Sequence, residues 1–273
     1  MNALPSKQKA GRYPDFLIVG EMRCGSTTLW ELLERHPRVW FSEEKELHFF
    51  DNRYDRWEKG EEWYREQFLG AGDEMICGEA TPDYLFHDRV CERIHSLVPD
   101  VKLLVVLRDP VGRAWSHYWH NVRRGRESLS FEEALREESS RLAKGDAQER
   151  AHFSYRTRGH YIKRIEHYQR VFGEDALEVL FLPDLVGGAA GVMDTVWRHL
   201  GLEAPSSGMD LNLPQRNAAT FPKSPGFDRC CRQAMGLARK SRLLAVPAGM
   251  VASLTRKYRT YSGRARMDEN SEF

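Results

Sequence analysis

The residues best suited to bind a charged ligand form the segment Gly20-Glu-Met-Arg-Cys-Gly25-Ser-Thr-Thr28. It follows the apolar run Phe16–Val19, and leucines recur at helical spacing between Ser26 and His36. We therefore expect a strand, a loop and a helix over residues 15–37. Glycines let such a loop curl until its amides point inward, and a helix N-terminus adds a positive dipole end. The segment is predicted to bind the phosphates of a nucleotide; a tight turn capped by Ser26 is the structural alternative.

The position of the loop's cation separates two kinds of nucleotide chemistry. A kinase-type loop needs Lys directly after its second Gly, to reach the β- and γ-phosphates, and then Ser or Thr for Mg²⁺. Here Ser26 and Thr27 occupy those positions, and Arg23 lies two residues before Gly25. This arrangement favours a nucleotide with fewer phosphates at its reacting end and no required metal. A small-molecule kinase that uses ATP and Mg²⁺ is the alternative.

A second candidate phosphate site follows the apolar run Lys102–Leu107, which is typical of a buried parallel strand. Arg108 stands at the end of this strand, where ligands bind in open parallel sheets, and its guanidinium suits bidentate phosphate binding. Ser116 lies early in the next expected helix and could donate to the same phosphate. Asp109 has two interpretations that the sequence leaves open, a metal-binding acid of an NTPase and a turn residue before Pro110.

The fold class predicted from the alternating pattern is α/β, a P-loop-like open parallel sheet with helices on both faces. A third strand is expected over Leu177–Leu182, and 145–158 and 212–226 are predicted loops. We expect a flexible N-terminus over 1–14, one domain over 15–227 and a basic helical C-terminal extension of that domain over 228–273. The remaining helices are predicted at 61–68, 89–97, 111–124, 131–142, 160–172 and 192–200.

Composition narrows the cellular setting and the partners. The net charge of the 273 residues is +1, so no overall field attracts nucleic acid. Residues 1–14 lack the apolar core of a signal peptide, and no apolar stretch reaches the ~20 residues of a membrane span. The five cysteines follow no metal or disulfide pattern. We therefore expect a soluble cytoplasmic protein with reduced thiols.

The C-terminal segment is strongly basic, with ten Lys or Arg and no acidic residue between Arg229 and Met267. A solvated surface, a contact to an acidic substrate or membrane face, and an oligomer contact all fit this composition. Apolar residues from Leu243 to Leu254 give the segment one hydrophobic side, which predicts a helix interrupted at Pro247.

Four segments in order make the sequence similar to a known family. LIVGEMRCGSTTLWELLERHP and LLVVLRDPVGRAWSHYW resemble the two nucleotide-binding motifs of sulfotransferases that use 3′-phosphoadenosine-5′-phosphosulfate (PAPS). KELHFFD over 45–51 and GEATPDY over 78–84 resemble the corresponding segments of the heparan-sulfate type and its bacterial relatives. The likeness runs from about Asp15 to Trp119 and more weakly to about Leu185.

The resemblance implies roles for the residues that match the family's motifs. Arg23 would contact the phosphosulfate near its bridging oxygen and stabilise charge on the departing phosphate. Arg108 and Ser116 would hold the 3′-phosphate. The 5′-phosphate cradle would comprise Cys24, Gly25, Ser26, Thr27 and Thr28. No metal is required in this scheme.

Glu46 matches the acidic residue that acts as general base in the heparan-sulfate type. Its neighbours Leu47, Phe49 and Phe50 could provide a partly dry setting for that role. His48 is the rival base; if the segment is extended, both side chains share a face. A solvated acidic stretch, since Glu43 and Glu44 are adjacent, is the structural alternative for Glu46.

Departures from the family pattern bear on the substrate. Many relatives have Lys at the position of Arg23 and Gly at that of Cys24. Heparan-type enzymes often carry Lys where Ala80 stands, so its absence argues against a glycosaminoglycan acceptor. Arg216 and Lys223 are candidates for the family's C-terminal basic loop.

The acceptor is expected to be a hydroxyl-bearing small molecule or glycan, such as a carbohydrate, a glycolipid or a secondary metabolite. Aromatic residues could stack on it or belong to the core: Trp57, Trp63, Tyr64, Tyr84 and Phe86. A non-catalytic scaffold with a degenerate nucleotide pocket is a further alternative, against which the intact Arg23, Glu46 and Arg108 argue.

Overall fold

The computed structural model describes residues 11–205, 210–211, 220–222 and 260–262. The described residues fall into two compact units, and the chain passes between them after Asp109 and again before His160. The first unit contains the residues up to Asp109 and those from His160 to Leu211; the second contains Pro110–Gly159 with the two later segments. Neither crossing has the composition of a linker, so the sequence did not mark them. The predicted domain boundaries stay a prediction.

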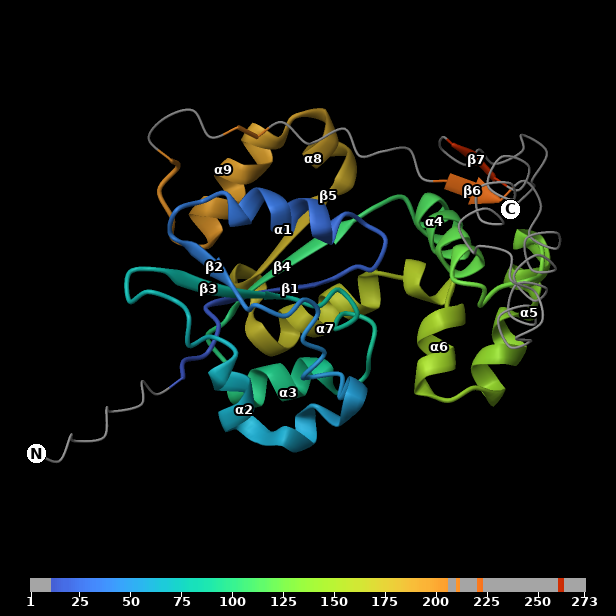
Figure 1. The fold of residues 1–273 in the computed structure, drawn as a ribbon, viewed down its shortest axis with the longest axis horizontal. Coiled ribbons are helices and arrows are strands. Elements are labelled where there is room, and N and C mark those ends of the chain that lie inside the picture. The colour runs from blue at the N-terminus through green and yellow to red at the C-terminus, as the bar shows by residue number, and fades with distance from the viewer. Residues whose placement is uncertain (1–10, 206–209, 212–219, 223–259, 263–273) are drawn as a thin grey trace, which may run out of the picture. The chain divides into compact units, whose positions relative to one another are not determined.

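The first unit is built on a five-stranded parallel sheet with the order β2-β3-β1-β4-β5 (Figure 1). This confirms the predicted fold class. The three predicted strands are present, but two strands were missed: the apolar run of β2 has only three residues, and β3 reads ICGEA, which is not continuously apolar. The strands are β1 Phe16–Gly20, β2 Val39–Phe41, β3 Ile76–Ala80, β4 Lys102–Leu107 and β5 Leu177–Phe181.

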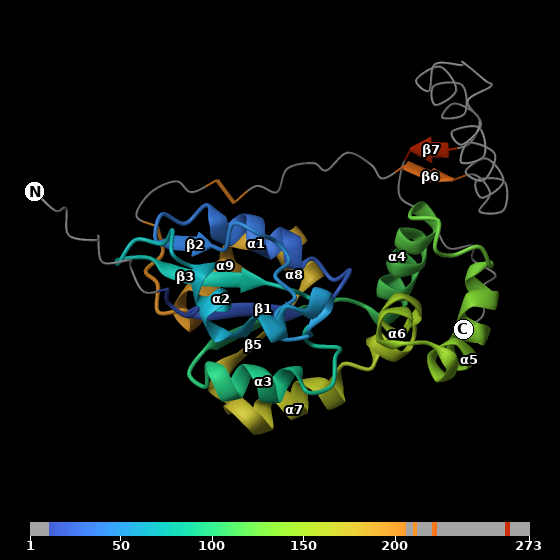
Figure 2. The same cartoon turned by 60° about the horizontal axis from the view of Figure 1, so that its bottom comes forward.

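Helices cover both faces of this sheet because alternate strand residues point to opposite sides. Phe16 and Ile18 pack with α1, α8 and α9, whereas Leu17 and Val19 pack with α2, α3 and α7. The two groups of helices lie above and below the sheet in Figure 1 and remain on opposite sides in Figure 2. Their bounds are α1 Ser26–Glu34, α8 Leu182–Gly187, α9 Ala189–His199, α2 Gly60–Glu66, α3 Val90–Leu97 and α7 Ile162–Phe172. Short 3-10 helices are η1 Arg53–Asp55, η2 Trp57–Lys59 and η4 Glu174–Ala176.

The loops that follow β1, β2, β3 and β4 leave the sheet at one edge, because all these strands are parallel. The segment after β3 is attached to β1: Thr81 N donates to Ile18 O (3.2 Å) and Leu85 N donates to Val19 O (2.8 Å). Gly20 permits this close approach, since a Cβ there would lie 2.6 Å from the Leu85 Cβ. The edge therefore brings together segments that are far apart in the sequence.

The second unit contains the helices α4 Pro110–Arg123, α5 Phe131–Lys144 and α6 Ala147–Phe153, the 3-10 helix η3 Thr157–Gly159, and the antiparallel pair β6 Thr220–Pro222 and β7 Thr260–Ser262. Its buried Glu127 accepts hydrogen bonds from Tyr155 (2.9 Å) and Arg141 and from two backbone amides. A capping box between Ser130 and Glu133 begins α5.

Three predicted loop or helix assignments were wrong in the second unit. Residues 145–158 contain α6, which begins where Asp146 accepts a hydrogen bond from the amide of Glu149; the polar helix lacks the apolar periodicity by which helices are predicted. Residues 220–222 form β6 and not a loop, and 260–262 form β7 and not a helix. The remainder of 212–226 and 228–273 lies outside the described residues. Among the helices that are described, none has both the length and the apolar character needed to cross a bilayer.

A glycine in β3 provides a test of the sheet's packing. A Cβ on Gly78 would lie 2.2 Å from the ring of Phe16, which is fully buried. We expect Gly78→Ala to destabilise the protein by about 1–3 kcal/mol, because the core must shift. Gly191→Ala in α9, where a Cβ meets nothing within 4 Å, is the matched control and should stabilise it by about 0.4–1 kcal/mol. Urea unfolding of both variants measures the difference; equal midpoints would contradict the predicted packing.

Candidate functional site

The loop between β1 and α1 is a tight turn that leads directly into the N-terminus of α1. Glu21 N donates to Val106 O (3.0 Å), and Cys24 N donates to Glu21 O (3.1 Å) within the loop. Gly25 has φ 103°, precedes α1 as its N-cap residue, and has no room for a Cβ beside Leu182. Because the N-cap residue is Gly25 and no side chain caps the helix, the alternative of a turn capped by Ser26 is wrong.

The side chains predicted to bind the donor lie along this loop and the first turn of α1. Arg23 is half-buried in a left-handed conformation (φ 70°), which is uncommon for a residue with a side chain and is typical of functional loops. Ser26 is buried, Thr27 is exposed and Thr28 is half-buried. The first turn of any helix leaves amide groups free of intrahelical partners, so this end of α1 can bind an anion.

Tyr161 connects the loop to the end of β4. Its hydroxyl donates to the backbone oxygen of Arg108 (3.1 Å) and lies 3.7 Å from Sγ of the buried Cys24. Tyr161 was not among the predicted site residues, because it fell within the predicted helix over 160–172 and no sequence pattern marked its hydroxyl. We infer that it holds the Arg108 backbone beside the loop.

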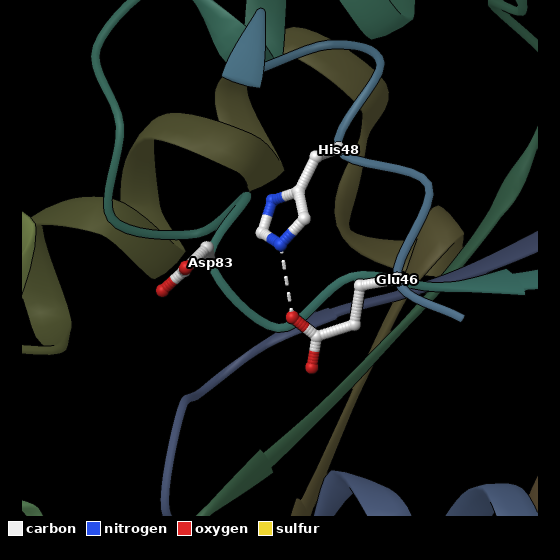
Figure 3. Close-up of side chains that lie close together, drawn as sticks. All are labelled: Glu46, His48 and Asp83. Carbon is white, nitrogen blue, oxygen red and sulfur yellow. Dashed lines mark ion pairs between the residues drawn. The ribbon is translucent and has the colours of Figure 1, made fainter. Parts of the chain in front are cut away.

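The two candidate bases, Glu46 and His48, lie side by side on the loop that follows β2. His48 Nε2 is 3.1 Å from Glu46 Oε2, and the two side chains point toward one another in Figure 3. His48 has φ 50°, so the segment is not extended, yet the predicted proximity is present. The imidazole is 6% exposed and the Glu46 side chain 34% exposed. Only the carboxylate is therefore open to an incoming molecule, and Glu46 is no freely solvated acid.

Asp51, which the sequence analysis did not single out, completes a carboxylate–imidazole–carboxylate chain. Its Oδ2 is 2.7 Å from His48 Nδ1, and its side chain is 1% exposed. Burial by itself disfavours the imidazolium, but the hydrogen bonds to Asp51 and Glu46 outweigh this effect and raise the pKa of His48 to about 9. The spacing Glu-x-His-x-x-Asp of Glu46, His48 and Asp51 was the sequence pattern that could have identified Asp51.

A cationic group, the Arg53 guanidinium, lies beside the His48 ring. Arg53 Nη1 is 3.1 Å from His48 Nε2 and 3.3 Å from Asp83 Oδ2. Atoms of Glu46, His48 and Asp83 also lie within 4.8 Å of one another, a separation at which they could hold a cation. His48 Nε2 cannot form hydrogen bonds with both neighbours at once. A bond to Glu46 requires a proton on Nε2, whereas a bond from Arg53 requires an unprotonated Nε2 as the acceptor. We favour the Glu46 contact because the raised pKa of His48 keeps both ring nitrogens protonated at neutral pH.

The remaining predicted residues occupy separate places. Arg108, half-buried, follows β4 at the edge described above, and the exposed Asp109 lies beside it. Ser116 lies on α4 in the second unit. Arg216 and Lys223 lie outside the described residues. Of the aromatic candidates for acceptor stacking, Tyr64 and Tyr84 are fully buried and belong to the core, whereas Trp57, Trp63 and Phe86 are half-buried.

The fold is an α/β fold in which the β1–α1 loop and a carboxylate–imidazole pair follow strands of the same parallel sheet. Residues 13–219 match the family model of the sulfotransferase domain. The chain therefore belongs to the sulfotransferase family.

Individual relatives agree with this assignment. The chain is 31% identical over 256 residues to human heparan sulfate glucosamine 3-O-sulfotransferase 6, covering 93% of this chain and 71% of that protein. It is 31% identical to the membrane-associated sulfotransferase kil1 of Dictyostelium discoideum, over 50% of this chain and 30% of that protein. A sulfotransferase structure from Alicyclobacillus acidocaldarius superimposes with a TM-score of 0.67 at 28% identity, covering 88% of this chain and 99% of that one.

The buried imidazole makes stability depend on pH in a defined direction. Because the pKa of His48 is about 9 in the folded protein and 6.5 ordinarily, its stabilising contribution is complete below pH 6.5. It decreases above that value and is lost as the pH rises through about 9. NMR titration of the His48 ring should give a midpoint near 9, and Asp51→Asn should lower it. A midpoint near 6.5 in the unaltered protein would contradict the described geometry.

Proposed function

We propose that this protein transfers a sulfuryl group from PAPS to a hydroxyl or amine of a carbohydrate, glycolipid or secondary metabolite. The observation that carries the proposal is the Glu46–His48 pair (3.1 Å) on the same edge of the sheet as the β1–α1 loop. A phosphate-binding loop beside a candidate base supplies the two elements that group transfer from a nucleotide requires. Membership of the sulfotransferase family supports sulfur as the transferred centre.

The donor would lie along the edge formed by the loops after β1 and β4. Arg23 and the N-terminus of α1 would hold the 5′-phosphosulfate, since a guanidinium and helix amides both bind anions. Arg108 would hold the 3′-phosphate. No step of this scheme calls for a metal. The ATP-dependent kinase alternative lacks a Lys after Gly25 and would need one to reach the β- and γ-phosphates.

In the proposed reaction, the acceptor oxygen attacks the sulfur in line with the bond to the bridging phosphate oxygen. Glu46 takes the acceptor proton as the new S–O bond forms, and the bond to the bridging oxygen breaks. The products are the sulfated acceptor and 3′-phosphoadenosine 5′-phosphate, whose charge Arg23 stabilises. His48, held by Asp51, orients the Glu46 carboxylate; a buried imidazole whose two nitrogens are both engaged is a poor base for an incoming hydroxyl.

A glycan is the acceptor that the relatives favour. Several relatives of this chain are named for heparan sulfate glucosamine 3-O-sulfation. Ala80 stands where heparan-type enzymes often carry a Lys. We therefore propose that the acceptor is a glycan with less negative charge than heparan sulfate. A cytoplasmic location stays a prediction, which fractionation of cells that express the protein would test.

The base assignment predicts a specific loss. Glu46→Gln keeps the shape of the side chain but removes its basicity, so turnover should fall by about 10²–10⁴-fold while binding of 3′-phosphoadenosine 5′-phosphate is retained. The measurement is transfer from radiolabelled PAPS to a panel of heparan sulfate, galactolipid and phenolic acceptors. Glu43→Gln, an exposed acid in the same loop, is the control. Near-normal turnover of Glu46→Gln would overturn the assignment.

The donor site predicts a phosphate-specific loss for Arg108→Ala. Calorimetry should show weaker binding of 3′-phosphoadenosine 5′-phosphate by about 1.5–3 kcal/mol, the value of a hydrogen bond to a charged group. Adenosine 5′-phosphate should bind nearly as before, because it lacks the 3′-phosphate. Arg170→Ala on the exposed surface of α7 is the matched control. Equal losses for both nucleotides would count against Arg108 as the 3′-phosphate ligand.

A further inference from the structure

The proposed mechanism does not use Glu79, a buried carboxyl on β3. It is 1% exposed, and three hydroxyl groups donate to it. Tyr64 donates to Oε2 (2.6 Å), whereas Thr81 (2.8 Å) and Tyr84 (2.5 Å) both donate to Oε1. Burying a carboxyl is costly even when it is hydrogen-bonded, so a purely apolar residue would serve the core better. Burial also raises the pKa of Glu79.

Two of these three hydroxyls also hold the loop that carries Glu46 and His48. Thr81 Oγ1 accepts a hydrogen bond from His48 N (3.3 Å). The Tyr84 hydroxyl accepts from Phe49 N (2.9 Å) and, more weakly, from Phe50 N (3.4 Å). Tyr64 has no such contact with these amides, and its ring stacks on Phe49 instead (4.3 Å between centroids).

The carboxyl sets the direction of these hydrogen bonds. A hydroxyl has one proton, so a hydroxyl that donates to Glu79 must present its lone pairs to the loop amides. Both loop-holding hydroxyls share Oε1, and only Tyr64 uses Oε2. Oε1 therefore remains an acceptor even if the carboxyl carries a proton on Oε2, and the direction holds in either protonation state.

Glu79 lies next to the central strand of the sheet. It pairs in register with Leu17 of β1, which leads into the β1–α1 loop. Through Glu79, the loop amides are held in place relative to β3 and β1, and β1 also leads to Gly20 and Arg23. His48 needs such support because its backbone is left-handed (φ 50°), a conformation that non-glycine residues seldom adopt unaided.

We propose that Glu79, Thr81 and Tyr84 together form an anchor that positions the base. Glu79 orients the Thr81 and Tyr84 hydroxyls, which fix the His48 and Phe49 amides and, through His48, the Glu46 carboxylate. This inference rests on the proposed function. It assigns to Glu79 no contact with either substrate.

The decisive experiment compares Tyr84→Phe with Tyr64→Phe. Both tyrosines are fully buried, both donate to Glu79, and both changes keep the aromatic ring. Only Tyr84→Phe removes the acceptor of the loop amides. Tyr84→Phe should lose more Tm than Tyr64→Phe, because it also leaves the Phe49 and Phe50 amides without this acceptor. The kcat should fall by about tenfold or more in Tyr84→Phe alone, as expected when a reacting group is misplaced. The KM for PAPS should be unchanged in both.

Thr81 gives a second pair that remains informative if the tyrosine variants fold poorly. Thr81→Val removes the hydroxyl at nearly constant shape, and Thr81→Ser retains it. Val should lower kcat, and Ser should restore most of it. Equal kcat in Val and Ser, or an equal fall in Tyr84→Phe and Tyr64→Phe, would overturn the positioning role.

Amide hydrogen exchange separates this inference from the proposed function. Exchange at Phe49 and Phe50 should accelerate in Tyr84→Phe but not in Tyr64→Phe, whether or not any acceptor is sulfated. Unchanged exchange in Tyr84→Phe would reject the anchor. If the unaltered protein transfers nothing from PAPS while exchange behaves as expected, the anchor stands and the proposed activity fails.

Discussion

The parallel pairing of β1 with β3 and β4 is the constraint on which the site depends. Parallel strands end at one edge of their sheet, so every loop that leaves these strands at its carboxyl end meets the others there. The β1–α1 loop, the loop that carries Glu46 and the residue Arg108 are separated by tens of residues in sequence but share this edge. Gly20 lets the segment after β3 pack against β1 at the point where the β1–α1 loop begins.

The chemistry at this edge depends on how charge is buried. His48 lies between two carboxylates, Asp51 fully buried and Glu46 partly open. The buried carboxylate stabilises the positive charge of the imidazole and fixes its orientation, and the imidazole in turn orients the exposed carboxylate. Because the Asp51 side chain is buried and the Glu46 side chain is partly exposed, Glu46 is the carboxylate of this pair that an incoming molecule could reach.

Some strands and helices were predicted from the sequence and others were missed, because not every element has a recognisable pattern of apolar residues. Apolar runs such as Lys102–Leu107 predicted buried strands with the observed bounds, because continuous hydrophobicity is the property that a two-sided sheet requires. Strand β3 was missed, because ICGEA includes the polar Glu79, whose hydroxyl partners come from α2 and from the segment after the strand. Helix α6 was missed because a polar helix with few apolar residues has no periodic pattern.

The sequence by itself determined where the candidate site residues lie relative to the predicted strands. The spacing of Arg23 and Gly25 and the cation after β4 were evident from residue types and local patterns, whereas Glu46 and His48 were singled out through the family resemblance. Only the tertiary structure decided how they are held: the role of Asp51 on His48, the contact of Tyr161 with Arg108, and the anchoring of the Glu46 loop by Glu79. Local patterns report on residues within a few positions of one another. The Asp51–His48 contact spans three positions, but Tyr161 and Arg108 are 53 positions apart and Thr81 and His48 are 33 positions apart. Only the folded chain brings these distant segments within hydrogen-bond distance.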